Sequence, residues 1–164
     1  RMSTSATLGL RLVGFKTTSS QTRTVRTVSK REAFKFSGIE AVVRQYLTDA
    51  DTDQLRQEEL QIFLERVDDL LHHFLLQRKY KFIGSSLLFV FDSSPTSSFK
   101  PKLKMIDFAH TVPLEDQATM DDGYIQGLRE LHAVFQKILG LEHSHGSHDP
   151  CKPTPTPSPS GKRG

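Results

Sequence analysis

The longest apolar run of the chain lies in the stretch Lys81-Phe82-Ile83-Gly84-Ser85-Ser86-Leu87-Leu88-Phe89-Val90-Phe91-Asp92. Its five consecutive apolar residues, bounded by polar ones, predict a buried strand over residues 81–92. A second buried strand is predicted downstream, and the polar segment 93–98 between the two favours a turn or loop. Two strands joined by a short polar loop are typical of an antiparallel hairpin. The second strand is built on Leu103, Met105, Ile106 and Phe108.

Three other segments show the apolar spacing of three and four residues that marks amphipathic helices. The clearest spans roughly residues 52–79, with charged residues on its opposite face. A shorter helix is predicted over 38–47, with Ser37 as its N-cap and Glu40 as the capping-box partner. The third is predicted over 122–139, where Asp121 and Asp122 suit the positive N-terminal end of the helix.

The first part of the chain is basic, since no acidic residue precedes Glu32 whereas seven lysines and arginines do. Alternating leucines predict a half-buried strand over residues 8–16, and this alternation argues against the helical stripe of a transit peptide. Residues 17–29 are rich in Thr, Ser and Arg and are interpreted as a loop or a ragged hairpin arm. Two interpretations of their charge stay open: a solvated loop, or an edge that faces an anion.

The composition of the 164 residues excludes several classes of protein. One cysteine, Cys151, excludes a disulfide framework and favours a reducing compartment, so we expect a cytoplasmic or nuclear location. The apolar run is far shorter than the ~20 residues of a membrane-spanning helix, so we expect no membrane partner. Asp49, Asp51 and Asp53 lack the Gly and the distal Glu of a calcium loop and favour turn and cap chemistry.

Histidines provide no convincing metal site in this sequence. His72 and His73 are neighbours on a predicted helix, where successive side chains diverge by about 100°, so they are interpreted as partly exposed bystanders. The segment 142–164 is a Pro/Ser/Thr/Lys tail that cannot bury enough apolar surface to fold, and it contains three more histidines. We therefore expect one domain over residues 1–141 and a disordered tail over 142–164.

One segment alone is expected to place reactive side chains on rigid structure, and it is Ile106-Asp107-Phe108-Ala109-His110. A carboxylate at the exit of a buried strand is costly unless it is paired or bound to a cation. A strand-end Asp followed by Phe is also how protein kinases hold magnesium on the phosphates of ATP. From these residues alone, an Asp that caps the following turn remains the alternative.

Three segments of the chain, in this order, resemble the inositol polyphosphate kinase family. They are Gly84-Ser85-Ser86-Leu87-Leu88-Phe89-Val90-Phe91-Asp92, then Lys104-Met105-Ile106-Asp107-Phe108-Ala109-His110-Thr111, then Asp122-Gly123-Tyr124-Ile125-Gln126-Gly127-Leu128. They match the Ser-Ser-Leu-Leu, Ile-Asp-Phe and Gly-Tyr-x-x-Gly-Leu segments of that family. The Ile-Asp-Phe-Ala-His run is most similar to the multikinase and hexakisphosphate kinase branches, and the likeness covers about residues 3–139.

This resemblance implies an α+β kinase fold, with an antiparallel sheet and packed helices, that uses ATP and Mg²⁺ to phosphorylate soluble inositol polyphosphates. Asp107 matches the Asp that holds the metal on the nucleotide phosphates. Ser85 and Ser86 match a Ser-Ser pair close to the nucleotide that supports this Asp. His110 matches a His near the substrate phosphates, with a hydrogen-bonded structural His as the alternative. Asp107 and His110 are thus the expected catalytic residues.

The chain departs from the family in one important respect. The Pro-x-x-x-Asp-x-Lys-x-Gly motif, which would supply an Asp and a Lys to the inositol site, occurs nowhere in the sequence. The smaller lobe, which would carry a nucleotide-facing Lys, is missing too. We therefore interpret the chain as the C-terminal part of such a kinase and expect it to be inactive by itself, because phosphoryl transfer depends on positioning and charge stabilisation.

Two functions of other classes compete with the kinase. A non-catalytic interaction module could retain the kinase fold. An RNA-binding domain could use the basic first third, but nucleic-acid binders usually interleave aromatic residues with such charge. No aromatic residue lies between Phe15 and Phe34, so nucleic acid is a weaker expectation than an inositol polyphosphate.

Overall fold

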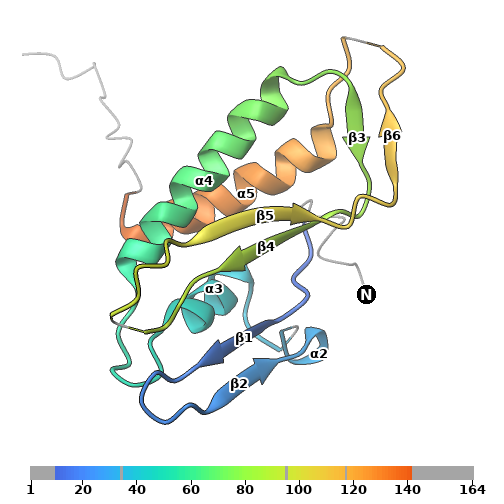
Figure 1. Ribbon diagram of the computed structural model, residues 1–164. Coiled ribbons are helices and arrows are strands. Elements are labelled where there is room, and N and C mark those ends of the chain that lie inside the picture. The colour runs from blue at the N-terminus through green and yellow to red at the C-terminus, as the bar shows by residue number, and fades with distance from the viewer. Residues whose placement is uncertain (1–9, 34, 95, 117, 142–164) are drawn as a thin grey trace, which may run out of the picture.

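A computed structural model describes residues 10–33, 35–94, 96–116 and 118–141 of the chain (Figure 1). In these residues the strands form three antiparallel pairs, accompanied by four helices, which confirms the α+β class. The pairs are β1 (Phe15–Thr18) with β2 (Val25–Val28), β3 (Tyr80–Phe82) with β6 (Thr111–Pro113), and β4 (Ser86–Val90) with β5 (Lys102–Ile106). The helices are α2 (Lys30–Ala33), α3 (Ile39–Leu47), α4 (Gln57–Leu76) and α5 (Asp122–Leu139).

Helices α4 and α5 lie side by side, and the β4–β5 hairpin crosses over them (Figure 1). Each helix places one apolar stripe toward the other and toward the sheet, as the sequence spacing predicted. The predicted long helix is confirmed, although α4 is shorter at both ends than the predicted 52–79. The side chains most deeply buried between these elements are Leu60, Phe63, Val67, Phe74, Leu128 and Phe135.

The predicted hairpin is confirmed, with Leu88 opposite Lys104 and Val90 opposite Lys102. Only one of its faces is covered, however, so the prediction of two fully buried strands is wrong. Leu87, Phe89, Leu103 and Met105 pack against the helices, whereas Leu88, Val90 and Ile106 are exposed. The reason is that the described residues place a helical layer on one side of this sheet alone.

The predicted single strand over 81–92 is divided in two. β3 and β4 are separated at Gly84, whose φ of +71° lies in the left-handed region that glycine adopts without strain. The chain turns there, so β3 pairs with β6 and β4 pairs with β5. Alternating hydrophobicity does not reveal such a change of partner, because apolar residues stand on both sides of Gly84-Ser85-Ser86.

The N-terminal part differs most from expectation. The predicted strand over 8–16 is wrong for residues 10–14, which form no strand, and β1 begins only at Phe15. The hairpin arm predicted for 17–29 does form, as the turn and strand that pair with β1. Leu10 and Leu12 nevertheless pack against the main core. Their alternation therefore reflects burial of an extended segment without a strand partner.

The predicted capping box at Ser37 is also wrong. Gly38 precedes α3 and no side chain caps that helix. Glu40 instead pairs with Arg44, at 2.9 Å, and with Lys137 of α5, at 3.1 Å. A capping box does form at α2, where the Glu32 carboxylate accepts from the Ser29 amide at 2.8 Å.

Turn and cap chemistry at the aspartates after α3 is confirmed. The Asp49 carboxylate accepts from the amides of Asp51 and Thr52 and pairs with Arg56. Asp51 accepts hydrogen bonds from the β1–β2 turn, including those from the Ser19 and Ser20 hydroxyls, and the Ser19 bond lowers the pKa of Asp51. This carboxylate therefore ties the β1–β2 hairpin to the loop that precedes α4.

Two smaller predictions concern exposure and membranes. His72 and His73 are both exposed on α4, as expected for bystanders. Within the described ranges, no helix combines the length and the apolar character that crossing a bilayer requires. The predicted disordered tail, 142–164, lies outside the described residues.

Replacing Gly14 by alanine is expected to destabilise the fold strongly. Its φ is +137°, and a Cβ built there would lie 2.3 Å from the backbone oxygen of Val28, at the end of β2. Backbone strain of about 1–3 kcal/mol would add to this collision. We expect a loss of about 3 kcal/mol or more in the free energy of unfolding, measured by chemical denaturation.

Gly38→Ala is the matched control, because its φ is +109° and nothing lies within 4 Å of the added Cβ. It should cost only the strain. Equal losses in the two variants would show that the contact between Gly14 and β2 is not close in solution.

Candidate active site at the end of the central hairpin

The structure brings the predicted site residues together in two adjacent segments. Ser86, the first residue of β4, pairs with Ile106, the last residue of β5, so Ser85 lies beside the point where Asp107 leaves the sheet. The Ile83 amide donates to the backbone oxygen of His110 at 3.2 Å. Residues 83–86 and 106–111 thus form one structural unit that contains all four candidates.

Asp107 is exposed and has an unusual backbone conformation. Its φ of +64° lies in the left-handed region, which Asp and Asn tolerate better than other residues with a side chain. Its carboxylate forms no hydrogen bond or ion pair with any described residue. The turn that follows is closed by Thr111, whose amide and hydroxyl both donate to the Phe108 oxygen, at 3.2 and 3.0 Å. The alternative of a turn-capping Asp107 is therefore wrong, and the carboxylate faces solvent.

The two serines have different surroundings. The Ser85 Oγ and the hydroxyl of Tyr124 are buried next to each other, and in the described part of the chain neither has a hydrogen-bond partner other than the other. Burial raises the pKa of Tyr124, and the neighbouring Ser85 hydroxyl opposes that rise. Ser86 is half-buried and, as the partner of Ile106, lies on the outer face of the sheet. Ser85 is thus placed to support the loop from within, and Ser86 to face what lies on the sheet.

His110 is exposed at the end of the same turn. The structure gives its backbone oxygen a partner, the Ile83 amide, and gives its imidazole ring none among the described residues. The ring is therefore available to a ligand, while the backbone holds its position.

An apolar surface adjoins Asp107. Leu88, Val90 and Ile106 on the outer face of the hairpin are 45%, 37% and 36% exposed, and Phe108 is 52% exposed. Lys102 and Lys104 lie on the same face, opposite Val90 and Leu88. An exposed apolar patch bordered by polar residues is typical of a binding surface. We call these six residues the outer face of the hairpin.

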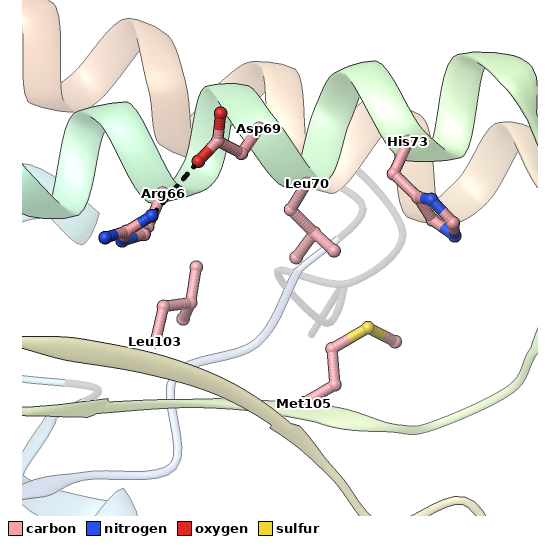
Figure 2. A pocket seen from close by; sticks show the side chains of 6 residues that line it. All are labelled: Arg66, Asp69, Leu70, His73, Leu103 and Met105. Carbon is pink, nitrogen blue, oxygen red and sulfur yellow. Dashed lines mark hydrogen bonds and ion pairs between the residues drawn. The ribbon is translucent and has the colours of Figure 1, made fainter.

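A separate cavity of about 250 Å³ lies on the other side of the hairpin, between α4 and β5 (Figure 2). Figure 2 shows Leu70 of α4 opposite Leu103 and Met105 of β5, with Arg66 and Asp69 joined as an ion pair above them. His73 completes the lining. None of the predicted site residues lines this cavity, so it is distinct from the candidate active site.

The donor set decides which metal the site could hold. Among the residues that the structure describes, no cluster of three or more His, Cys, Asp or Glu could bind a metal ion. Asp107 alone contributes one unpaired carboxylate. Mg²⁺ is commonly held by one or two carboxylates together with substrate phosphates. The site therefore fits a metal that arrives with a nucleotide and does not fit a metal bound by protein groups alone.

Sequence reasoning missed the residues that support this unit. Asp121 is 2% exposed, and its carboxylate accepts from the Phe82 amide at 2.7 Å and from the Tyr124 amide at 3.3 Å. The ring of Phe82 lies 6.0 Å from that of Phe108, edge to face. The sequence indicated Asp121 only as a residue suited to a helix N-terminus. Nothing in the sequence indicated its bond to β3, 39 residues away.

The described basic residues that precede Glu32 are exposed. Arg11, Lys16 and the arginines of the β1–β2 hairpin form no ion pair with another described residue. Both interpretations of this charge, solvated or anion-facing, are compatible with that arrangement.

Comparison with known proteins identifies relatives for most of the chain. The family model described as inositol polyphosphate kinase matches residues 1–136. Mouse inositol hexakisphosphate kinase 3 is 30% identical over 83% of this chain and 39% of its own length. Human inositol-trisphosphate 3-kinase A is 30% identical over 84% of this chain and 30% of its own length. The chain thus spans about two fifths or less of the length of these curated relatives.

Solved structures show the same fold. A structure of an inositol phosphate multikinase superposes with a TM-score of 0.71 and 20% identity, over 84% of this chain and 65% of the other. The multikinase Ipk2 from S. cerevisiae, solved in complex with ADP and Mn²⁺, gives a TM-score of 0.65 and 18% identity, over 84% and 66%. The match of the family model over most of the sequence agrees with the three ordered motifs and with the fold. The chain belongs to the inositol polyphosphate kinase family.

Proposed function

We propose that this chain forms the metal-holding and nucleotide-facing part of an ATP-dependent kinase for soluble inositol polyphosphates. One observation carries the proposal: in a member of this family, Asp107 leaves the end of β5 in a left-handed conformation with its carboxylate exposed and unpaired. An exposed carboxylate that no described protein group pairs with is free to bind a divalent cation that arrives with substrate phosphates.

The outer face of the hairpin supports the nucleotide side of the proposal. Its exposed apolar side chains, Leu88, Val90 and Ile106, would receive the base of ATP, and Asp107 lies beyond the last of them. When it is bound, Mg²⁺ would neutralise charge on the phosphates and stabilise the charge that develops during transfer. Ser86 faces the same surface, and Ser85 would support the loop from beneath. The related yeast multikinase bound to ADP and Mn²⁺ is consistent with such a pairing of nucleotide and divalent metal.

The substrate side rests on charge. An inositol polyphosphate is a compact polyanion, and it needs cationic or hydrogen-bonding groups beside the transferred phosphate. His110 lies three residues beyond Asp107 in the same turn and would contact the substrate phosphates. The exposed basic residues of β1–β2 and the segment before it would provide further positive charge. A cytoplasmic or nuclear location, where both substrates are soluble, remains part of this proposal.

A second candidate function is a non-catalytic interaction module of the same fold. The exposed apolar side chains of the outer face, Leu88, Val90 and Ile106, favour it, because such a patch also suits a protein partner. Replacement of Asp107 separates the two functions, because an interaction module has no need of an exposed carboxylate at this position.

Asp107→Asn in the natural protein that contains this chain is expected to lower turnover about a thousandfold. Asn keeps the size of the side chain and tolerates the positive φ, so the fold should survive. The change removes a charge interaction worth about 4 kcal/mol in the transition state. The measurement is transfer of phosphate from ATP to an inositol polyphosphate across a magnesium titration.

Asp122→Asn is the matched control, because it removes another exposed carboxylate, at the start of α5, without changing the turn. It should keep normal turnover. Near-normal turnover of Asp107→Asn at ordinary magnesium would refute the kinase function of this site and favour the interaction module.

Leu88→Ser is expected to raise the KM for ATP about tenfold and to change kcat little. It removes apolar surface from the centre of the outer face, and losing that burial is worth about 1–2 kcal/mol of nucleotide binding. Leu76→Ser, at an exposed leucine of α4, is the control for a general loss of apolar surface. If both variants bind ATP like the unmodified protein, the nucleotide does not lie on this face.

A further inference from the structure

The buried carboxylate of Asp121 does more than cap α5. One oxygen, Oδ1, accepts from the Tyr124 amide at 3.3 Å, which is the bond of an N-cap. The other, Oδ2, accepts from the Phe82 amide at 2.7 Å, in a strand 39 residues away. Ser, Thr or Asn would cap the helix equally well. Burial of a carboxylate is costly, so the feature that distinguishes Asp here is the second oxygen and its bond to β3.

Phe82 and Ile83 in turn hold the turn that carries Asp107. Phe82 pairs with Thr111 in the β3–β6 ladder, and its ring meets that of Phe108 edge to face. The next amide, that of Ile83, donates to the His110 oxygen at 3.2 Å. Three residues of the segment 107–111 are thus attached to Phe82, whose amide donates to Asp121, or to its neighbour Ile83.

Aromatic packing also holds the ring of Phe82 in place. Its ring lies 5.5 Å from Phe74 of α4 and 6.1 Å from Tyr124 of α5, and these two rings stack on each other at 4.3 Å. Phe82 is therefore held by its amide on one side and by its ring on the other. Asp107 itself has no contact of this kind, and its exposed carboxylate depends on the backbone for its position.

We propose that Asp121 is a positioning residue for Asp107, which it acts on through Phe82 and the turn 107–111. The inference rests on the proposed function, in which Asp107 holds the metal on the nucleotide. Positioning matters here because a misplacement of about 1 Å in a phosphoryl-transfer site can cost two orders of magnitude in rate. The Asp121 carboxylate sets the place of the turn without touching substrate or metal.

The test separates the two hydrogen bonds of Asp121. In the natural protein that contains this chain, Asp121→Ser keeps a hydroxyl that can cap α5 but is too short to reach the Phe82 amide. Asp121→Asn keeps the size and one acceptor oxygen, so only one of the two amides can be satisfied. Asp122→Asn is the control, since it removes the neighbouring charge from the same helix terminus.

The first measurement is amide hydrogen exchange, which does not depend on activity. In Asp121→Ser we expect the amides of Ile83 and Thr111 to exchange at least tenfold faster, and those of α4 to be unchanged. Asp121→Asn should fall between Asp121→Ser and the unmodified protein. Asp122→Asn should match the unmodified protein. Unchanged exchange at Ile83 and Thr111 in folded Asp121→Ser would overturn the inference.

The second measurement is the metal concentration for half-maximal turnover. We expect Asp121→Ser to raise it about tenfold while the KM for the inositol polyphosphate stays within about twofold, because a displaced Asp107 weakens the metal site first. A uniform loss of turnover with unchanged metal dependence would mean a merely structural role and would overturn the inference. If exchange at Ile83 and Thr111 is unchanged in Asp121→Ser while Asp107→Asn is inactive, the positioning role alone is rejected. If Asp107→Asn is active, the proposed function itself is rejected.

Discussion

The rest of the structure depends on the contacts that the ring of Phe89 makes with the helices. It meets Phe63 of α4 at 5.1 Å and Phe135 of α5 at 5.8 Å, edge to face in both cases. The backbone oxygen of the same residue accepts from the Tyr46 hydroxyl of α3 at 2.7 Å. Three helices and the central hairpin therefore meet at one residue of β4. Each buried aromatic ring contributes about 1.5–3 kcal/mol by burial, and the edge-to-face contacts add to this.

This contact fixes which face of the hairpin is covered. Because side chains alternate along a strand, placing Phe89 on the helices places Leu88 and Val90 on the opposite side. A shift of one residue in register would exchange the two faces. The open outer face and the emergence of Asp107 at the far end of β5 are thus consequences of the same core that stabilises the fold.

The candidate site occupies the edge of that core, where regular structure ends. Gly84 and Asp107 both have positive φ, and each marks a point where the chain leaves one ladder for another. The turn 107–111 needs support that the hairpin does not supply. Asp121 and the aromatic group around Phe82 provide it from α4 and α5, so the buried carboxylate of Asp121 supports the exposed carboxylate of Asp107.

The sequence by itself determined the elements whose signal is local. The apolar spacing of α3, α4 and α5, the apolar residues of β4 and β5 and the order of the three motifs are sufficient to predict these three helices, the hairpin, the family and Asp107, whereas the short helix α2 was not predicted. These features depend only on residues close together in the chain. For that reason the bounds of α3 and α5 were predicted to within one residue and those of α4 to within five.

Tertiary structure decided everything that depends on distant partners. Gly38 and Ser37 show that a capping motif in sequence is not used when Glu40 finds Arg44 and Lys137 instead. Apolar residues on both sides of Gly84 concealed the exchange of strand partners. The hydrogen bond between Asp121 and Phe82 joins residues that are 39 positions apart in the sequence. The sequence alone does not show which distant amide will donate to a carboxylate oxygen. Such bonds form only when packing has already brought the two segments together, and so the support of the site is a property of the fold and not of any motif.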